Sequence, residues 1–126
     1  MNQDAFNAFC NNLPHTTHVV QWGGSDVWKI GGKVFAISGW NEGMDHCVTF
    51  KCSPSSFDMM KDQPGIRPAP YLASRGMKWL QQTTNETLSV AEVEGYLVNS
   101  YRLVSQGLTK KLQKELGLLA HEDTAK

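Results

Sequence analysis

Apolar residues near the start of the chain recur at the spacing of one helix face. Phe6, Phe9 and Cys10 stand three and four positions apart, which is typical of an amphipathic helix rather than of a strand. Pro14 follows this run and cannot continue a helix. The pattern predicts a helix over residues 2–12, followed by a β region.

The segment VWKIGGKVFAI, residues 27–37, changes to the pattern of a β-hairpin. Two apolar-rich runs flank Gly31-Gly32, and a pair of glycines is a strong signal for a two-residue turn. With that loop, Trp28 pairs with Phe35, and directly paired residues share a face of the sheet. We therefore expect a buried side formed by Trp28, Ile30, Phe35 and Ile37.

The next strand, CVTFKC at residues 47–52, repeats the alternation of apolar and polar positions. Its buried side takes Val48, Phe50 and Cys52. The open side of the sheet takes Lys29, Thr49 and Lys51. An antiparallel sheet with one face against the core and the other toward water is the expected result.

A second helix and a last strand follow. Ser53-Pro54 has the form of an N-cap with proline in the first turn, and we expect this helix to run to about Lys61. Two prolines then impose an extended course, before a short strand over residues 78–82. The strand is predicted to place Lys78 and Leu80 on one face, and Trp79 and Gln81 on the other.

The clearest helix start lies in LSVAEV, residues 88–93, where Ser89 and Glu92 have the spacing of a capping box. The apolar face of this helix takes Val93, Leu97, Ser100, Tyr101 and Val104. Gly107 supplies its C-terminal stop, and Thr109 caps a last short helix.

The order of elements is a helix, several antiparallel strands, a helix, a strand and further helices. This order predicts an α+β fold in which the helices pack on one face of the sheet. We expect a single domain over residues 1–119 and a flexible C-terminal tail over residues 120–126.

Composition narrows the classes of function. The chain has 126 residues, and twelve Lys and Arg residues balance twelve Asp and Glu residues. This balance argues against a protein that coats nucleic acid non-specifically, because phosphate binding depends on a surplus of cations. Three cysteines without a CxxC pair are typical of reduced thiols. With no signal peptide or transmembrane segment in sight, we expect a cytoplasmic protein that is a monomer and does not bind a membrane.

Motifs for catalysis or for a metal are not found. The sequence contains no GxSxG, no HExxH and no glycine-rich phosphate loop. Four histidines are scattered, without the ligand spacing of a zinc site. We therefore expect no enzyme activity, no metal and no cofactor.

Four segments together resemble the MmcQ/YjbR-like family of small bacterial proteins. They are VWKIGGKVFAI (27–37), VTFKCSP (48–54), IRPAPYL followed by Trp79 (66–79) and SYRLV (100–104). The resemblance implies a fold similar to CyaY, the bacterial frataxin, and a "double wing" DNA-binding motif, without a well-defined catalytic activity. Frataxins also suggest an iron role, but the first helix here offers only Asp4, whereas hard cations need several oxygen ligands. This chain departs from the family pattern in one segment. In related sequences fewer residues separate the Tyr-Leu pair from the tryptophan, whereas here Ala73 to Lys78 stand between them.

The remaining candidate site is cationic and aromatic, because Lys and Arg contact phosphates and aromatic rings stack on bases. Its predicted members are Lys29, Lys51, Arg67, Tyr71, Arg75, Lys78 and Arg102. Trp79 fits a core position as well as a ligand contact. Two hypotheses remain open: a nucleic-acid-binding domain with DNA as its partner, and a non-catalytic module that binds a protein or a small anionic ligand.

Overall fold

The computed structural model describes residues 2–21, 24–39, 47–70 and 72–117. Along the chain, the elements are α1 (Gln3–Asn11), β1 (Thr16–Gln21), β2 (Ser25–Ile30), β3 (Lys33–Ser38), β4 (Val48–Lys51), α2 (Pro54–Met60), β5 (Ile66–Pro68), η1 (Ala73–Arg75), β6 (Trp79–Gln82), α3 (Val90–Gln106) and α4 (Lys110–Glu115). The predicted tail, residues 120–126, lies outside the described residues.

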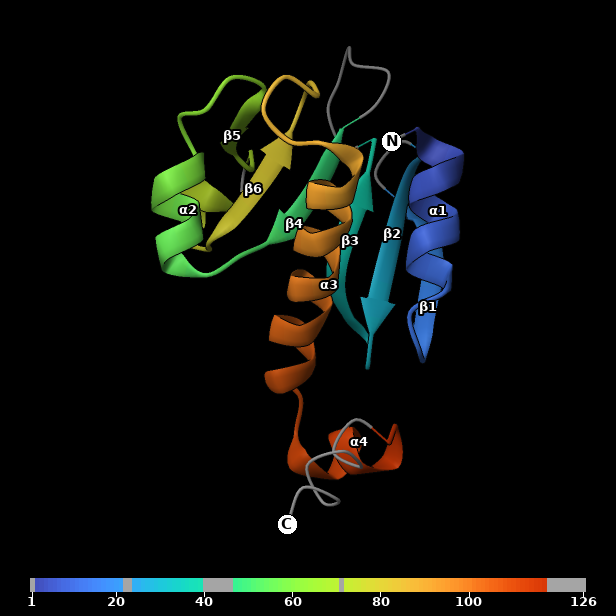
Figure 1. Ribbon diagram of the computed structural model, residues 1–126. Coiled ribbons are helices and arrows are strands. Elements are labelled where there is room, and N and C mark those ends of the chain that lie inside the picture. Colours follow the sequence, from blue (N-terminus) through green and yellow to red (C-terminus); the bar gives the residue numbers. More distant parts are fainter. Residues whose placement is uncertain (1, 22–23, 40–46, 71, 118–126) are drawn as a thin grey trace.

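Six strands form one sheet in the order β1-β2-β3-β4-β6-β5, and every neighbouring pair is antiparallel. Figure 1 shows α1, α2 and α3 on the same side of this sheet, with α3 in front of β3 and β4 and α1 in front of the β1 edge. The predicted α+β architecture is therefore confirmed. Of the two edges, β5 is short and contains Pro68, whereas β1 has six residues and no proline.

The predicted helix caps are present. The Ser53 hydroxyl accepts a hydrogen bond from the backbone of Ser56, and Pro54 starts α2. Ser89 and Glu92 form both hydrogen bonds of the capping box at the start of α3. Thr109 caps α4. Each of these side chains satisfies a backbone N–H that the helix leaves free, so the local sequence fixes where the helices begin.

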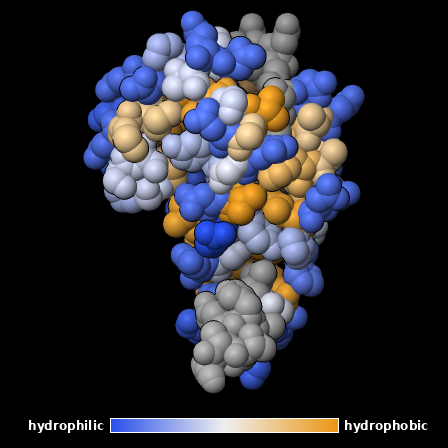
Figure 2. All heavy atoms as spheres, in the orientation of Figure 1, coloured by the Kyte–Doolittle hydropathy of each residue, from blue (hydrophilic) through white to orange (hydrophobic). Residues whose placement is uncertain are grey.

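The core lies between the helices and the near face of the sheet. Its fully buried side chains include Phe6 from α1, Phe35 and Phe50 from the sheet, and Leu97 from α3. The Tyr96 ring stacks on Phe50 with 5.2 Å between ring centroids. Figure 2, which views the helix side, shows hydrophobic residues around the middle of the molecule and hydrophilic ones around its rim. Burial of such side chains contributes about 1.5–3 kcal/mol each and is the main force that holds α3 on the sheet.

The β2–β3 hairpin turns at Gly31 and Gly32, as predicted, and both have positive φ angles of 60° and 81°. This left-handed conformation suits glycine and the tight turns of hairpins. A Cβ atom on Gly31 would lie 2.6 Å from Leu108 Cδ1. The segment between α3 and α4 therefore packs directly on the turn, and a side chain at position 31 has no room.

The predicted hairpin register is correct at the turn and wrong beyond it. Lys29 pairs with Val34, but a β-bulge shifts the register so that Trp28 pairs with Ala36 instead of Phe35. The extra residue lets both Phe35 and Ala36 join the core. Ile37 consequently pairs with Val27 and Thr49 on the opposite face, which corrects its predicted place on the core side.

The pairing of β3 with β4 ends at Ala36 and Phe50, and a helix side chain bridges the next two residues, Phe35 and Lys51. The backbone N–H of Lys51 donates to the Ser100 hydroxyl at 2.9 Å, and this hydroxyl donates to the Phe35 carbonyl oxygen at 2.6 Å. Ser100 is fully buried. One hydroxyl on α3 thus satisfies two backbone groups that the irregular ladder leaves without a strand partner.

None of the helices in the described part of the chain is long and apolar enough to cross a membrane.

Replacing Ser100 with alanine should destabilise the fold by about 2 kcal/mol, because it leaves a buried N–H and a buried C=O unpaired. Chemical denaturation of the wild type and of Ser100→Ala measures this difference. Ser105→Ala is the matched control: its hydroxyl bonds only the Tyr101 carbonyl one turn earlier in the same helix, and its loss should cost less than about 0.5 kcal/mol. Equal losses in the two variants would contradict a bridging role for Ser100.

Candidate functional site

Two lysines lie on the face of the sheet that points away from the core. Lys29 stands between Trp28 and Ile30, which both belong to the core, and Lys51 follows the buried Phe50. Because side chains alternate along a strand, both lysines point to the opposite face, which is turned away from the viewer in Figure 1. β3 runs between their strands, so their backbones are about 10 Å apart.

Arg67 lies on the same face and holds a buried polar row. Its Nε and Nη2 atoms donate to Gln81 Oε1 at 2.9 and 2.7 Å. The Gln81 amide in turn donates to Thr49 Oγ1 at 3.1 Å. Gln81 and Thr49 are fully buried. Since the acceptor, Gln81 Oε1, is neutral, these two hydrogen bonds orient the guanidinium group without cancelling its charge.

Charge is distributed unevenly between the two faces of the sheet. The lysines and arginines of the six strands are Lys29, Lys33, Lys51 and Arg67, and their one acidic residue is Asp26. Asp26 contacts His18 and α1 on the helix side. We call Lys29, Lys51 and Arg67 the cationic face. No strand residue supplies it with a carboxylate.

The centre of this face is not the open surface that the alternation predicted. Val27 and Thr49 have no exposed area, and Ile37 is 1% exposed. The prediction that Thr49 faces water is therefore wrong. Lys29, Lys51 and Arg67 themselves are half-buried and stand around this closed centre. The side chains of this face that remain accessible are therefore its cations rather than its strand centres.

The other predicted site residues do not gather on the cationic face. Lys78 places its ammonium group 4.9 Å from the centre of the Phe57 ring, which belongs to the core on the helix side. Arg102 is exposed on α3, and Arg75 is exposed at the end of η1. Tyr71 lies outside the described residues. Of the seven candidates, only the three of the cationic face are shown to share it.

Trp79 also belongs to this face, because it pairs with Lys51 across β4 and β6. It is 4% exposed, so the indole fills space as a core residue would. Its Nε1 atom is buried and has no hydrogen-bond partner.

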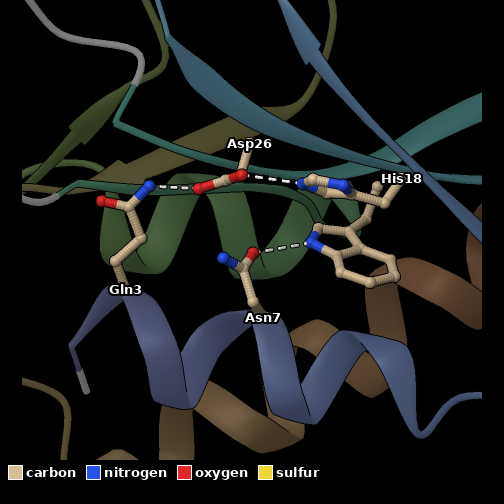
Figure 3. Close-up of polar contacts among 5 residues, drawn as sticks. Gln3, Asn7, His18 and Asp26 are labelled. Carbon is tan, nitrogen blue, oxygen red and sulfur yellow. Dashed lines mark hydrogen bonds and ion pairs between the residues drawn. The ribbon is translucent and has the colours of Figure 1, made fainter.

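A second polar cluster, on the helix side, was not predicted. Asp26 accepts hydrogen bonds from the Gln3 amide and from His18 Nε2, the latter at 2.7 Å. The His18 ring lies 4.8 Å from the Trp28 ring, whose Nε1 donates to Asn7 Oδ1 at 2.9 Å. Figure 3 shows Gln3 and Asn7 pointing from α1 toward this pair. The sequence signal that could have found the cluster is His18, eight positions before the one strand carboxylate.

This cluster fastens α1 to the sheet. Burial raises the pKa of Asp26, but hydrogen bonds from Gln3, His18 and Asn7 outweigh it and hold the pKa below its ordinary value. The ionised carboxylate is thus the state that this arrangement favours. We assign the cluster a structural role, because its hydrogen bonds join α1, β1 and β2 to one another.

The thiols of Cys10 and Cys52 are not activated. Burial raises the pKa of Cys10 to about 12 and that of Cys52 to about 11, and thiolates rather than thiols act as nucleophiles. Cys47 is buried as well. In the described part of the chain, no three His, Cys, Asp or Glu side chains come together as ligands for a metal ion.

The hydrogen bonds of Asp26 that fasten α1 to the sheet should weaken in acid. A carboxylate with a lowered pKa stabilises the fold fully above its unfolded pKa, near 3.8, and this contribution is lost as the pH falls through the lower, folded value. The stability of the wild type relative to Asp26→Asn should therefore be constant near pH 6 and shrink below about pH 4. Urea denaturation over this range measures it. The exposed Asp62→Asn variant is the control, and a wild-type advantage over Asp26→Asn that is independent of pH would contradict the assignment.

Comparison with known proteins places this geometry in a family. The family model described as YjbR matches residues 11–103. The chain is 30% identical to the uncharacterised protein YbdF of Escherichia coli O157:H7 over 93 residues, which cover 72% of this chain and 73% of YbdF.

Two solved structures share the fold. The Deinococcus radiodurans protein DR2400, of domain family DUF419, superposes with a TM-score of 0.79 at 23% identity and covers 92% of this chain and 88% of its own. A Pseudomonas syringae protein gives a TM-score of 0.63 at 21% identity and covers 82% of this chain and 98% of its own. With a family match that takes in the whole sheet and most of α3, this chain belongs to the YjbR family.

Proposed function

We propose that this chain binds nucleic acid through the cationic face. The observation that carries the proposal is the one-sided charge of the strands: Lys29, Lys51 and Arg67 share a face that has no strand carboxylate. In a chain with no net charge, such a separation creates a local positive potential. Phosphate groups are the anions that Lys and Arg most often meet in nucleic acids.

The spacing of the cations favours an extended polyanion over one small anion. Four strand spacings separate Lys29 on β2 from Arg67 on β5, which is about 19 Å. Two side chains that far apart cannot bind one phosphate group together. A nucleic-acid backbone offers a series of phosphates and can meet all three cations.

Each cation has a different part in this proposal. Lys29 and Lys51 act as mobile point charges, because an ammonium group on a flexible stem adapts to a phosphate. Arg67 is held by Gln81 and presents its remaining N–H groups in a fixed direction. Contacts of this kind bind the backbone and not the base edges, so the proposed binding has little sequence preference.

The proposal includes no chemical step. The described thiols are buried, and the His18–Asp26 pair is engaged in holding α1. In this proposal the chain acts in the cytoplasm, where free thiols persist, and as a monomer whose one face is occupied by the ligand.

Lys29→Glu and Lys51→Glu should each weaken binding of fluorescein-labelled DNA by about tenfold at low salt, because each variant removes a phosphate-binding cation and adds repulsion. Arg102→Glu is the matched control, since it makes the same change of charge on the exposed side of α3 and should bind as the wild type does. Fluorescence anisotropy with duplex and single-stranded oligonucleotides measures the affinities.

Salt dependence gives the second readout of the same titrations. The slope of log K against log salt should become shallower by about 0.9 on duplex DNA, or about 0.7 on a single strand, for each phosphate that a variant no longer neutralises. A wild type that binds neither DNA at low salt contradicts the proposal. A shallow slope with saturable binding of inorganic phosphate would instead indicate a module for a small anion.

A further inference from the structure

Three polar side chains form one row across the sheet, from its interior to the β5 edge. Thr49 on β4 pairs with Gln81 on β6, and Gln81 pairs with Arg67 on β5. Thr49 and Gln81 have no exposed area, whereas Arg67 is half-buried. Packing alone does not require such a row, because apolar groups of the same shape fill a buried position about as well. The row therefore calls for another explanation.

The row holds the Arg67 guanidinium group by one side only. Its Nε and Nη2 atoms donate to the same acceptor, Gln81 Oε1, at 2.9 and 2.7 Å. Because the three C–N bonds of a planar guanidinium group are about 120° apart, an acceptor shared by Nε and Nη2 lies opposite Nη1. Nη1 and the second N–H of Nη2 therefore form a two-pronged donor on the side away from the buried amide. Among the described residues, no carboxylate lies within ion-pair distance of this group.

The amide of Gln81 is itself fixed in one orientation. Its Nε2 atom donates to Thr49 Oγ1 at 3.1 Å, which leaves Oε1 directed at Arg67. Arginine has donors only, so this orientation is the one that the pair needs. A carboxylate in the place of the amide would accept the same hydrogen bonds but would cancel the positive charge. A neutral acceptor directs the guanidinium group and leaves its charge available to an anion from outside the chain.

We propose that Gln81 and Thr49 are positioning residues, which hold Arg67 so that its free N–H groups bind two oxygens of one phosphate group. The inference rests on the proposed function, because it assigns one phosphate of the bound nucleic acid to Arg67. It also deepens that function: a lysine meets a phosphate as a point charge, whereas an arginine forms two parallel hydrogen bonds in a defined plane. A guanidinium group that is already oriented loses less freedom on binding, which strengthens the contact.

Gln81→Glu tests the requirement for a neutral acceptor. The two side chains have nearly the same shape, and the Thr49 hydroxyl can turn to donate to a carboxylate, so we expect the variant to fold. Its new carboxylate should pair with Arg67 and weaken the binding of fluorescein-labelled duplex DNA by about tenfold. The slope of log K against log salt should also become shallower by about 0.9, because one phosphate is no longer neutralised. Fluorescence anisotropy with the full chain measures both quantities.

Two further variants keep a positive charge at position 67 and remove only the geometry. Arg67→Lys replaces the two-pronged donor with a point charge, and Gln81→Met removes the acceptor that directs Arg67. Each should weaken binding at low salt by about threefold, because the contact with phosphate is less well oriented. Each should also keep the salt slope of the wild type, because the number of neutralised phosphates does not change. A purely structural role for Gln81 would leave the affinity of the folded variants unchanged.

A charge control and a double variant complete the set. Gln106→Glu makes the same change of charge at the exposed end of α3, and it should bind as the wild type does. In an Arg67→Met background, Gln81→Met should cause no further loss of binding, since Gln81 acts only through Arg67. Thermal denaturation of every variant shows that the comparison is made between folded proteins.

The outcomes separate this inference from the proposed function. Wild-type affinity in Gln81→Glu or in Arg67→Lys, together with weaker binding by Lys51→Glu, overturns the positioning of Arg67 and leaves the cationic face intact. A further loss from Gln81→Met in the Arg67→Met background also overturns it, because Gln81 then acts by another route. A wild type that binds no DNA at low salt overturns both proposals.

Discussion

A single buried hydroxyl group, that of Ser100, ties α3 to two neighbouring strands at the centre of the sheet. The pairing of β3 with β4 ends at Ala36 and Phe50, and α3 links the two strands one residue further along. Packing alone would hold a helix on a sheet in several similar positions, because the hydrophobic effect has no direction. Hydrogen bonds are directional, so those of Ser100 fix where α3 lies along the strands. Phe35 points into the core and Lys51 points out of it on the two sides of this link.

The arrangement of charge follows from the alternation of side chains along the strands. Asp26, the one strand carboxylate, lies on the side that α1 covers, where three donors keep it ionised. Lys29, Lys51 and Arg67 lie on the other side, where Arg67 donates to the neutral Gln81. A chain without net charge can thus carry a local group of cations, because Lys29, Lys51 and Arg67 lie on the face opposite Asp26. The net charge calculated from composition describes the whole chain and does not show how charges are distributed between the faces of the sheet.

Local rules predicted the features that depend on residues a few positions apart. The three helix caps stand where capping chemistry requires them, alternation in β2 and β4 placed Lys29 and Lys51 on one face, and short segments of the strands and α3 indicated the YjbR family. The features that were missed depend on distant parts of the chain. Ser100 on α3 binds backbone groups of β3 and β4, and the polar row that Arg67 holds crosses three strands. No spacing rule encodes such contacts, so a polar residue in a strand is a poor guide to an open surface.

The two edges of the sheet differ in a way that bears on assembly. β5 ends one side with three residues and Pro68, which lacks the N–H that another strand would need, whereas β1 leaves six residues and no proline on the other. Another strand can be added at β1 but not at β5. Two copies paired through their β1 strands would therefore have β5 at both outer edges, and a third copy could not be added. The proline in β5 thus limits edge-to-edge addition of copies to a pair.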